Sequence, residues 1–128
     1  MAIRLDHLIV PSHDPLAGAK FLAGLLDVSW DPAGEPFKAV YVNQTLTVDF
    51  ALRERFEGHH YCFHVEDADF DAIFGRLQAQ GVAYRSRPRG ETDMKMNTRL
   101  GGKNLYWEDG DRHLWEILTV SYARAGVS

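Results

Sequence analysis

The chain contains a single cysteine, Cys62, among its 128 residues. One thiol cannot form an internal disulfide, which excludes the disulfide-stabilised scaffolds of small secreted proteins and favours a reducing compartment. The sequence also lacks an apolar run long enough to cross a membrane, and its N-terminus lacks the apolar core of a signal peptide. These absences predict a cytoplasmic protein that does not use a membrane as a partner.

An excess of positive charge is missing as well. The formal net charge is -4 at pH 7, which argues against a nucleic-acid-binding surface. The sequence is 45% hydrophobic and 25% charged, which is the composition of a soluble globular protein and not of a disordered one. A chain of this length can bury one ordinary hydrophobic core. We therefore expect a single domain that covers residues 1–128.

The first half of the chain, about residues 3–53, alternates between strand and helix signals. Residues 3–10 alternate in polarity as a strand does, and Asp14 followed by Pro15 is a typical helix start. The helix is expected to run to about residue 27. A short strand at 28–30 and longer strands at 37–43 and 45–53 are expected to follow it.

The second half, about residues 59–122, repeats this plan. It begins with a predicted strand at 59–66, in which His60, Cys62 and His64 share one face. Asp67 is the expected N-cap of a helix that ends at Gly81. Three further strands are expected, starting at residue 82 and covering residues 104–107 and 112–120. Both halves thus predict a strand, a helix and three strands.

Two histidines and two carboxylates occupy matching places in these halves. His7 and His60 lie in the first strand of each half, whereas Asp49 and Glu116 lie in the last strand of each half. A duplicated unit would bring all four residues to equivalent positions around one centre. Two neutral imidazoles with one or two carboxylates form a ligand set that suits divalent transition ions. The pattern therefore predicts a metal site.

Three segments of the chain resemble a known superfamily. They are Asp6-His7-Leu8-Ile9-Val10, His60-Tyr61-Cys62-Phe63-His64-Val65 and Gly110-Asp111-Arg112-His113-Leu114-Trp115-Glu116-Ile117. Their order and spacing over residues 3–122 resemble the vicinal oxygen chelate superfamily, which includes glyoxalase I, fosfomycin-resistance proteins, bleomycin-resistance proteins and extradiol dioxygenases. The resemblance implies an α+β fold in which two tandem βαβββ modules form an open, cup-shaped barrel of mixed sheets.

The resemblance also implies the roles of particular residues. His7, His60 and Glu116 match the metal ligands of the family, and they would hold one divalent ion, with Zn, Ni, Mn and Fe(II) not distinguished. Asp49 stands where metal-binding members often have Glu or Gln, and it either ligates the ion, binds a metal-bound water or acts as a base. The catalytic base would be Glu116, Asp49 or His64. His64 has an equally weighted structural interpretation, as a buried histidine bonded to the backbone.

The implied function is that of a metal-dependent enzyme of the glyoxalase or dioxygenase type. Such an enzyme would chelate a small, oxygen-rich, anionic substrate through two oxygens and perform lyase, isomerase, ring-opening or dioxygenase chemistry. Small family members commonly form homodimers, and the site could lie within one chain or be shared by two. One alternative is a bleomycin-resistance-like protein that sequesters an antibiotic without a metal, and another is a scaffold with a vestigial site.

A basic segment precedes the last two strands. Residues 85–103 hold six of the fourteen Lys and Arg residues of an acidic chain. An ordinary solvated loop is the more frequent explanation of such a run. The functional alternative is a mobile lid at 87–102, in which Arg99 and Lys103 bind the anionic substrate. That alternative requires at least one of these two side chains to reach the site.

Overall fold

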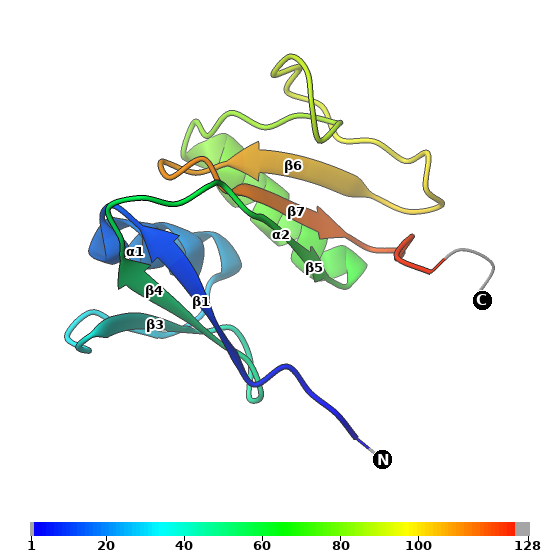
Figure 1. Ribbon diagram of the computed structural model, residues 1–128. Coiled ribbons are helices and arrows are strands. Elements are labelled where there is room, and N and C mark those ends of the chain that lie inside the picture. Colours follow the sequence, from blue (N-terminus) through cyan, green and yellow to red (C-terminus); the bar gives the residue numbers. More distant parts are fainter. Residues whose placement is uncertain (1, 125–128) are drawn as a thin grey trace. The chain divides into compact units, whose positions relative to one another are not determined.

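The computed structural model describes residues 2–124, and the chain divides into two compact units, Met1–Glu57 and Gly58–Ser128. Each unit contains a mixed sheet of its own and one helix (Figure 1). This arrangement confirms the predicted α+β class. No helix within residues 2–124 has the length and apolar character needed to cross a membrane.

The first unit contains five elements. They are β1 (His7–Ser12), α1 (Pro15–Leu26), β2 (Trp30–Asp31), β3 (Phe37–Tyr41) and β4 (Thr47–Leu52). The strands are ordered β1-β4-β3-β2, with β1 parallel to β4 and the other neighbours antiparallel. The predicted order of strand, helix and three strands is therefore confirmed, although β1 begins at His7 and not at residue 3.

Helix α1 begins as the sequence predicts. The Asp14 carboxylate accepts a hydrogen bond from the Ala17 backbone N–H at 3.1 Å, and Pro15 occupies the first helical position. On the helix, Leu22 and Leu25 are buried, as is Phe50 on β4. Burial of this apolar face holds the helix on one side of the sheet and leaves the other side to more polar residues.

The second unit contains β5 (His60–His64), α2 (Asp67–Ala79), β6 (Asn104–Glu108) and β7 (Leu114–Leu118). Its strands are ordered β5-β7-β6, with β5 parallel to β7 and β6 antiparallel to it. The strand predicted from residue 82 is reduced to an isolated bridge between Arg85 and Tyr106. The predicted N-cap was wrong by one residue, because Glu66 is the cap and its side chain makes no capping hydrogen bond.

The two units match in the register of their strands. In the first unit Asp49 lies opposite Ile9, two residues after His7. In the second unit Glu116 lies opposite Cys62, two residues after His60. Residues two apart on a strand share a face of the sheet. Each unit therefore places a histidine and a carboxylate on the same face of its sheet, offset by two residues along the strand.

The opposite face of the second sheet carries its apolar residues. The Tyr61 and Trp115 rings lie 4.6 Å apart between centroids, and Phe63 stacks on Trp115 at 5.9 Å. Figure 1 shows α2 running along this sheet, and its Phe70 is fully buried. A shift of one residue in register would expose these rings, so their burial specifies which face carries His60 and Glu116.

Candidate metal centre

His60 and Glu116 contact each other across the β5–β7 pair. The His60 Nδ1 lies 3.0 Å from the Leu114 carbonyl oxygen, and its Nε2 lies 2.9 Å from Glu116 Oε1. A carbonyl oxygen can only accept, so we assign the proton of the neutral imidazole to Nδ1. The Nε2 lone pair then faces a carboxylate oxygen. Two lone pairs at this separation repel each other unless a proton or a metal ion lies between them.

The spacing of these two atoms fits a shared metal ion. Bonds of about 2.1 Å to a nitrogen and an oxygen place the two ligand atoms about 3 Å apart when they meet at about 90°. The second ring nitrogen of a metal-binding histidine usually donates to a carbonyl or carboxylate, as His60 Nδ1 does to Leu114. The pair therefore has both the chemistry and the separation of two neighbouring ligands.

The Glu116 carboxylate is fully buried. Its Oε2 accepts a hydrogen bond from Asn104 Nδ2 at 2.5 Å, and the Tyr122 hydroxyl lies 2.8 Å from Oε1 and 2.7 Å from Oε2. These donors are neutral, whereas a buried carboxylate requires a cationic partner if it is to remain ionised at low cost. Among the described residues, His60 is the group near Glu116 that would be cationic only if it were protonated. The surroundings of Glu116 thus favour a cation at this point.

Burial and the neighbouring Glu116 both raise the pKa values of the ionisable groups around this carboxylate. The pKa of the Cys62 thiol is raised to about 12, chiefly by desolvation and further by the charge of Glu116. Desolvation and the hydrogen bond to Glu116 likewise raise the pKa of Tyr122. At neutral pH both groups therefore stay protonated. Without a bound metal, Cys62 is therefore a neutral neighbour of Glu116.

The matching residues of the first unit do not form such a pair. The exposed His7 ring places Nδ1 at 2.8 Å from Asp6 Oδ2. The pKa of His7 is raised chiefly by the hydrogen bond that its ring donates to Asp6, and the charge of Asp49 makes a smaller contribution. Asp49 is half-buried on β4 and acts on His7 through its charge. Among the described residues, the carboxylate that the structure pairs with His7 is therefore Asp6 and not Asp49.

The predicted set of three ligands joins residues of both units. Within residues 2–124, the structure gathers no group of three or more His, Cys, Asp or Glu side chains suited to a metal ion. Two members of the predicted set, His60 and Glu116, are in contact in the second unit. His7 belongs to the first unit. The three-residue set of His7, His60 and Glu116 therefore remains a prediction.

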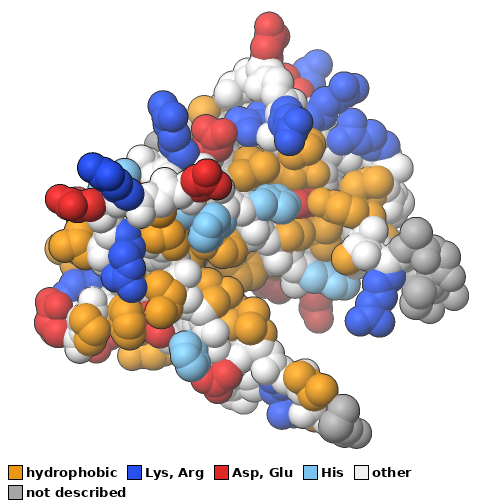
Figure 2. Space-filling view, in the orientation of Figure 1, with side chains coloured by type: hydrophobic (Ala, Val, Ile, Leu, Met, Phe, Trp, Pro, Cys, Tyr) orange, Lys and Arg blue, Asp and Glu red, His pale blue; other side chains and the backbone are white. Residues whose placement is uncertain are grey.

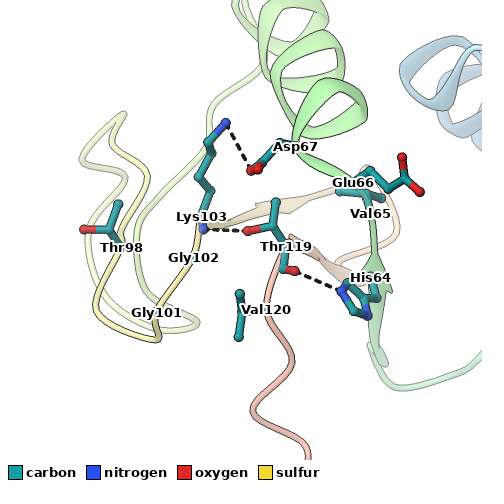
Figure 3. Close-up of a pocket in the computed structure, with 10 residues that line it drawn as sticks. All are labelled: His64, Val65, Glu66, Asp67, Thr98, Gly101, Gly102, Lys103, Thr119 and Val120. Carbon is teal, nitrogen blue, oxygen red and sulfur yellow. Dashed lines mark hydrogen bonds and ion pairs between the residues drawn. The ribbon is translucent and has the colours of Figure 1, made fainter. Parts of the chain in front are cut away.

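A groove of about 650 Å³ lies in the second unit (Figure 3). It brings together His64 and Lys103, which the sequence assigned to catalysis and to substrate binding. The His64 Nε2 donates to the Thr119 carbonyl at 2.9 Å, but the residue is exposed. Its structural interpretation thus holds for the backbone bond and not for burial. Lys103 Nζ lies 2.8 Å from Asp71 and 3.4 Å from Asp67. The groove is therefore lined by charges of both signs.

The basic segment is attached to the sheet at several points. Figure 2 shows its Lys and Arg side chains gathered at the top of the view. Asp93 accepts hydrogen bonds from the backbone and hydroxyl of Ser86, and Asn97 pairs with Asn104 through their backbones. The exposed Arg99 lies 3.4 Å from the Ser86 carbonyl. Lys103 thus reaches the groove, whereas Arg99 contacts its own segment.

Sequence reasoning missed Asn104 and Tyr122, the neutral donors to Glu116. Asn104 alternates with the buried Leu105 at the start of β6, so strand periodicity could have placed it on the face of Glu116. Tyr122 follows the last strand in irregular structure. No periodic signal in the sequence points to its contact with Glu116.

Comparison with known proteins gives matches among solved structures. No protein-family model and no curated protein matches the sequence. Oxidase ChaP-H2 is 36% identical over 98% of this chain and 100% of its own, with a TM-score of 0.87. Oxidase ChaP-H1 is 36% identical over 96% of this chain and 100% of its own, with a TM-score of 0.86. Fosfomycin resistance protein FosX from Mesorhizobium loti is 23% identical over 95% and 96%, with a TM-score of 0.68.

A further neighbour was solved with a metal ion. It is a mutant of FosX from Listeria monocytogenes in complex with Mn(II) and 1S,2S-dihydroxypropylphosphonic acid. It is 18% identical over 95% of this chain and 94% of its own, with a TM-score of 0.68. At this identity the likeness extends to the fold alone.

Proposed function

Because the chain belongs to the vicinal oxygen chelate superfamily, we propose that it is a metal-dependent enzyme. Its substrate is a small, oxygen-rich, anionic molecule that chelates the metal through two oxygens. The observation that carries this proposal is the buried Glu116 carboxylate 2.9 Å from the Nε2 of His60. The Mn(II) found in a FosX neighbour supports a divalent ion.

His60 and Glu116 supply two ligands in this proposal, and His7 supplies the third. The His7 side chain is exposed and its Nδ1 contacts Asp6, so Nε2 is its proposed ligand nitrogen. It would come from the same chain or from a second copy in a homodimer. When bound, the ion would act as a Lewis acid that polarises a substrate oxygen. Zn, Ni, Mn and Fe(II) all suit imidazole and carboxylate ligands.

The proposed base is His64, with Asp49 as the second candidate. Glu116 is less suited, since Asn104 and Tyr122 occupy its oxygens and hold it in place. His64 donates from Nε2 to the Thr119 carbonyl, which leaves Nδ1 as its basic nitrogen. His64 also lines the groove. A proton taken from a substrate there would be accepted at Nδ1.

The groove is the proposed binding place for the anionic part of the substrate. Lys103 is the cation that lines the groove. Its ammonium would leave its ion pairs with Asp71 and Asp67 and bind the anionic group of the substrate. Arg99 would contribute only after leaving the Ser86 carbonyl. Among the reaction classes that the family allows, the likeness to oxidase ChaP-H2 favours oxygenation over isomerase or lyase chemistry.

Metal analysis tests this function directly. Protein purified without chelators should contain about one divalent ion per chain, and a Glu116→Gln variant purified alongside it should contain none. Fe²⁺, Mn²⁺, Zn²⁺ and Ni²⁺ are then added in turn to metal-free protein, with turnover of candidate oxygen-rich anions as the readout. A wild-type protein that binds such an anion equally well with and without a metal would instead be a sequestering protein of the bleomycin-resistance type.

We also propose that the protein is a cytoplasmic homodimer. The single cysteine is compatible with a reducing compartment, and a second copy could bring His7 to the His60–Glu116 pair. Sedimentation equilibrium on metal-free and metal-loaded protein tests the dimer. Mixing His7→Ala with Glu116→Gln protein separates the two arrangements, because a site shared between copies recovers some intact centres in the mixed dimer.

A further inference from the structure

A continuous chain of side-chain hydrogen bonds connects the basic segment to Glu116. Asn104 Nδ2 donates to Glu116 Oε2 at 2.5 Å, and Asn104 Oδ1 accepts from Asn97 Nδ2 at 2.7 Å. Asn97 Nδ2 also donates to the Ser86 carbonyl at 2.5 Å. The chain thus begins in the segment that follows α2 and ends on a proposed metal ligand.

The direction of each amide in this chain is determined by its neighbours. The Ser86 carbonyl and Asn104 Oδ1 are both acceptors, so the NH2 group of Asn97 has to face them. The Glu116 carboxylate is also an acceptor, so the NH2 group of Asn104 has to face it. Turning either amide by half a rotation would place an oxygen against an oxygen. The orientations of the two amides are therefore coupled through the hydrogen bond that joins them.

The backbone and the burial of Asn97 support this reading. Asn97 and Asn104 exchange two backbone hydrogen bonds, of 2.8 and 3.0 Å, which holds their side chains next to each other. The Asn97 Oδ1 atom is buried, and within residues 2–124 no hydrogen-bond partner faces it. A buried acceptor without a partner costs stability. The NH2 group therefore makes the hydrogen bonds of this side chain, to Ser86 and to Asn104.

We propose that Asn104 and Asn97 are positioning residues for the Glu116 carboxylate. Asn104 holds Oε2, which turns Oε1 towards His60 Nε2. Asn97 does not touch Glu116 and acts through Asn104. The relay therefore couples the conformation of the basic segment to the His60–Glu116 pair. Its effect on metal affinity rests on the proposed function, whereas its effect on the pair itself does not.

Two substitutions test the relay, together with a matched control. Asn104→Leu removes the donor to Glu116. Asn97→Asp replaces a donor by an acceptor and should turn the Asn104 amide around. The control is Asn43→Asp, which adds the same charge in the first unit, where Asn43 Oδ1 only accepts hydrogen bonds from Thr45 and Leu46. An Asn97→Ala variant serves if Asn97→Asp fails to fold.

The first readout is the affinity for Mn²⁺, measured from the signal of free Mn²⁺ in electron paramagnetic resonance. Loss of a group that orients a metal ligand typically lowers metal affinity about 10- to 100-fold. We expect this loss for Asn104→Leu, a loss of about tenfold for Asn97→Asp, and none for the control. If wild type binds Mn²⁺ and Asn97→Asp and Asn104→Leu bind it equally well, the positioning role is wrong.

The second readout uses metal-free protein. The ring ¹⁵N signals of His60 should shift in Asn97→Asp and Asn104→Leu, because the Glu116 oxygen facing Nε2 turns away, and should stay in place in the control. Failure of wild type to bind Mn²⁺ would overturn the proposed function, while shifted His60 signals would still support the relay. Unshifted His60 signals in both variants would overturn the relay whatever the metal result.

Discussion

The two units have the same strand register but differ in whether their histidine and carboxylate meet. Glu116 reaches His60 across the sheet at 2.9 Å, whereas His7 bonds Asp6, its neighbour in sequence. Asp49 stands at the position equivalent to Glu116 but is one methylene shorter. Equal strand pairing is therefore not sufficient to bring the histidine and the carboxylate into contact.

The two carboxylates also differ in their burial and in their hydrogen-bond donors. Glu116 is fully buried and accepts hydrogen bonds from Asn104 and Tyr122. Asp49 is half-buried, and the histidine nearest to it in register is exposed. A buried, fully bonded carboxylate is held still, while an exposed imidazole can reorient. In the proposed site the second unit is thus the fixed part, and His7 of the first unit is the adaptable part.

The largest expected effect is on Mn²⁺ affinity, when the carboxylate of each unit is converted to an amide in a separate variant. Glu116→Gln should lower the affinity for Mn²⁺ by more than about 100-fold, because loss of a ligand exceeds loss of a group that orients one. Asp49→Asn should reduce turnover but change Mn²⁺ affinity by less than about tenfold. Both are measured by Mn²⁺ titration and steady-state kinetics. Equal losses of affinity would show that the two units contribute equally to the site.

Removing each histidine should separate metal binding from stability. His60→Ala leaves the buried Glu116 without the histidine that faces it and should destabilise the fold by about 1–3 kcal/mol. His7→Ala changes an exposed side chain and should alter stability by no more than about 0.5 kcal/mol. Both should weaken Mn²⁺ binding. Urea unfolding of metal-free protein provides the stability values, and a large loss in His7→Ala would identify His7 as structural.

Ligand recognition by the second unit can be tested at Lys103 and Arg99. Lys103→Ala should weaken the binding of inorganic phosphate about tenfold, because a charge-assisted hydrogen bond contributes about 1.5–3 kcal/mol. Arg99→Ala should have a smaller effect, because Arg99 bonds its own segment. Calorimetry gives the affinities, and metal content should stay unchanged in both variants. A larger loss in Arg99→Ala would place the anion outside the groove.

The smallest expected effect concerns the pKa of His7. It lies above the ordinary value of 6.5, chiefly because of Asp6. Asp6→Asn should therefore lower it, and Asp49→Asn should lower it less. A raised histidine pKa adds stability below pH 6.5 that is lost as the pH rises through the folded-state pKa, but for this exposed ring we expect only a slight change. Proton NMR titration of metal-free protein measures both shifts.

Much of the site could be predicted from local patterns. Strand alternation placed His60, Cys62 and His64 on one face of β5, and the repeat of His and carboxylate along the chain located all four residues that the register later aligned. The Asp14–Pro15 helix start was also confirmed. These features depend only on neighbouring residues and on the alternation of side chains along a strand, and both can be read directly from the sequence.

The sequence alone determined the duplicated α+β plan and the residue types of the site. Only the tertiary structure decided which of them touch. The His60–Glu116 contact spans 56 positions, Tyr122 reaches Glu116 from irregular structure, and Lys103 turns to Asp71 on α2. Each contact depends on the pairing of distant strands and on the reach of a side chain. Neither the pairing of distant strands nor the contact partner of a side chain can be read from a short stretch of sequence, because both are established only when the apolar faces pack.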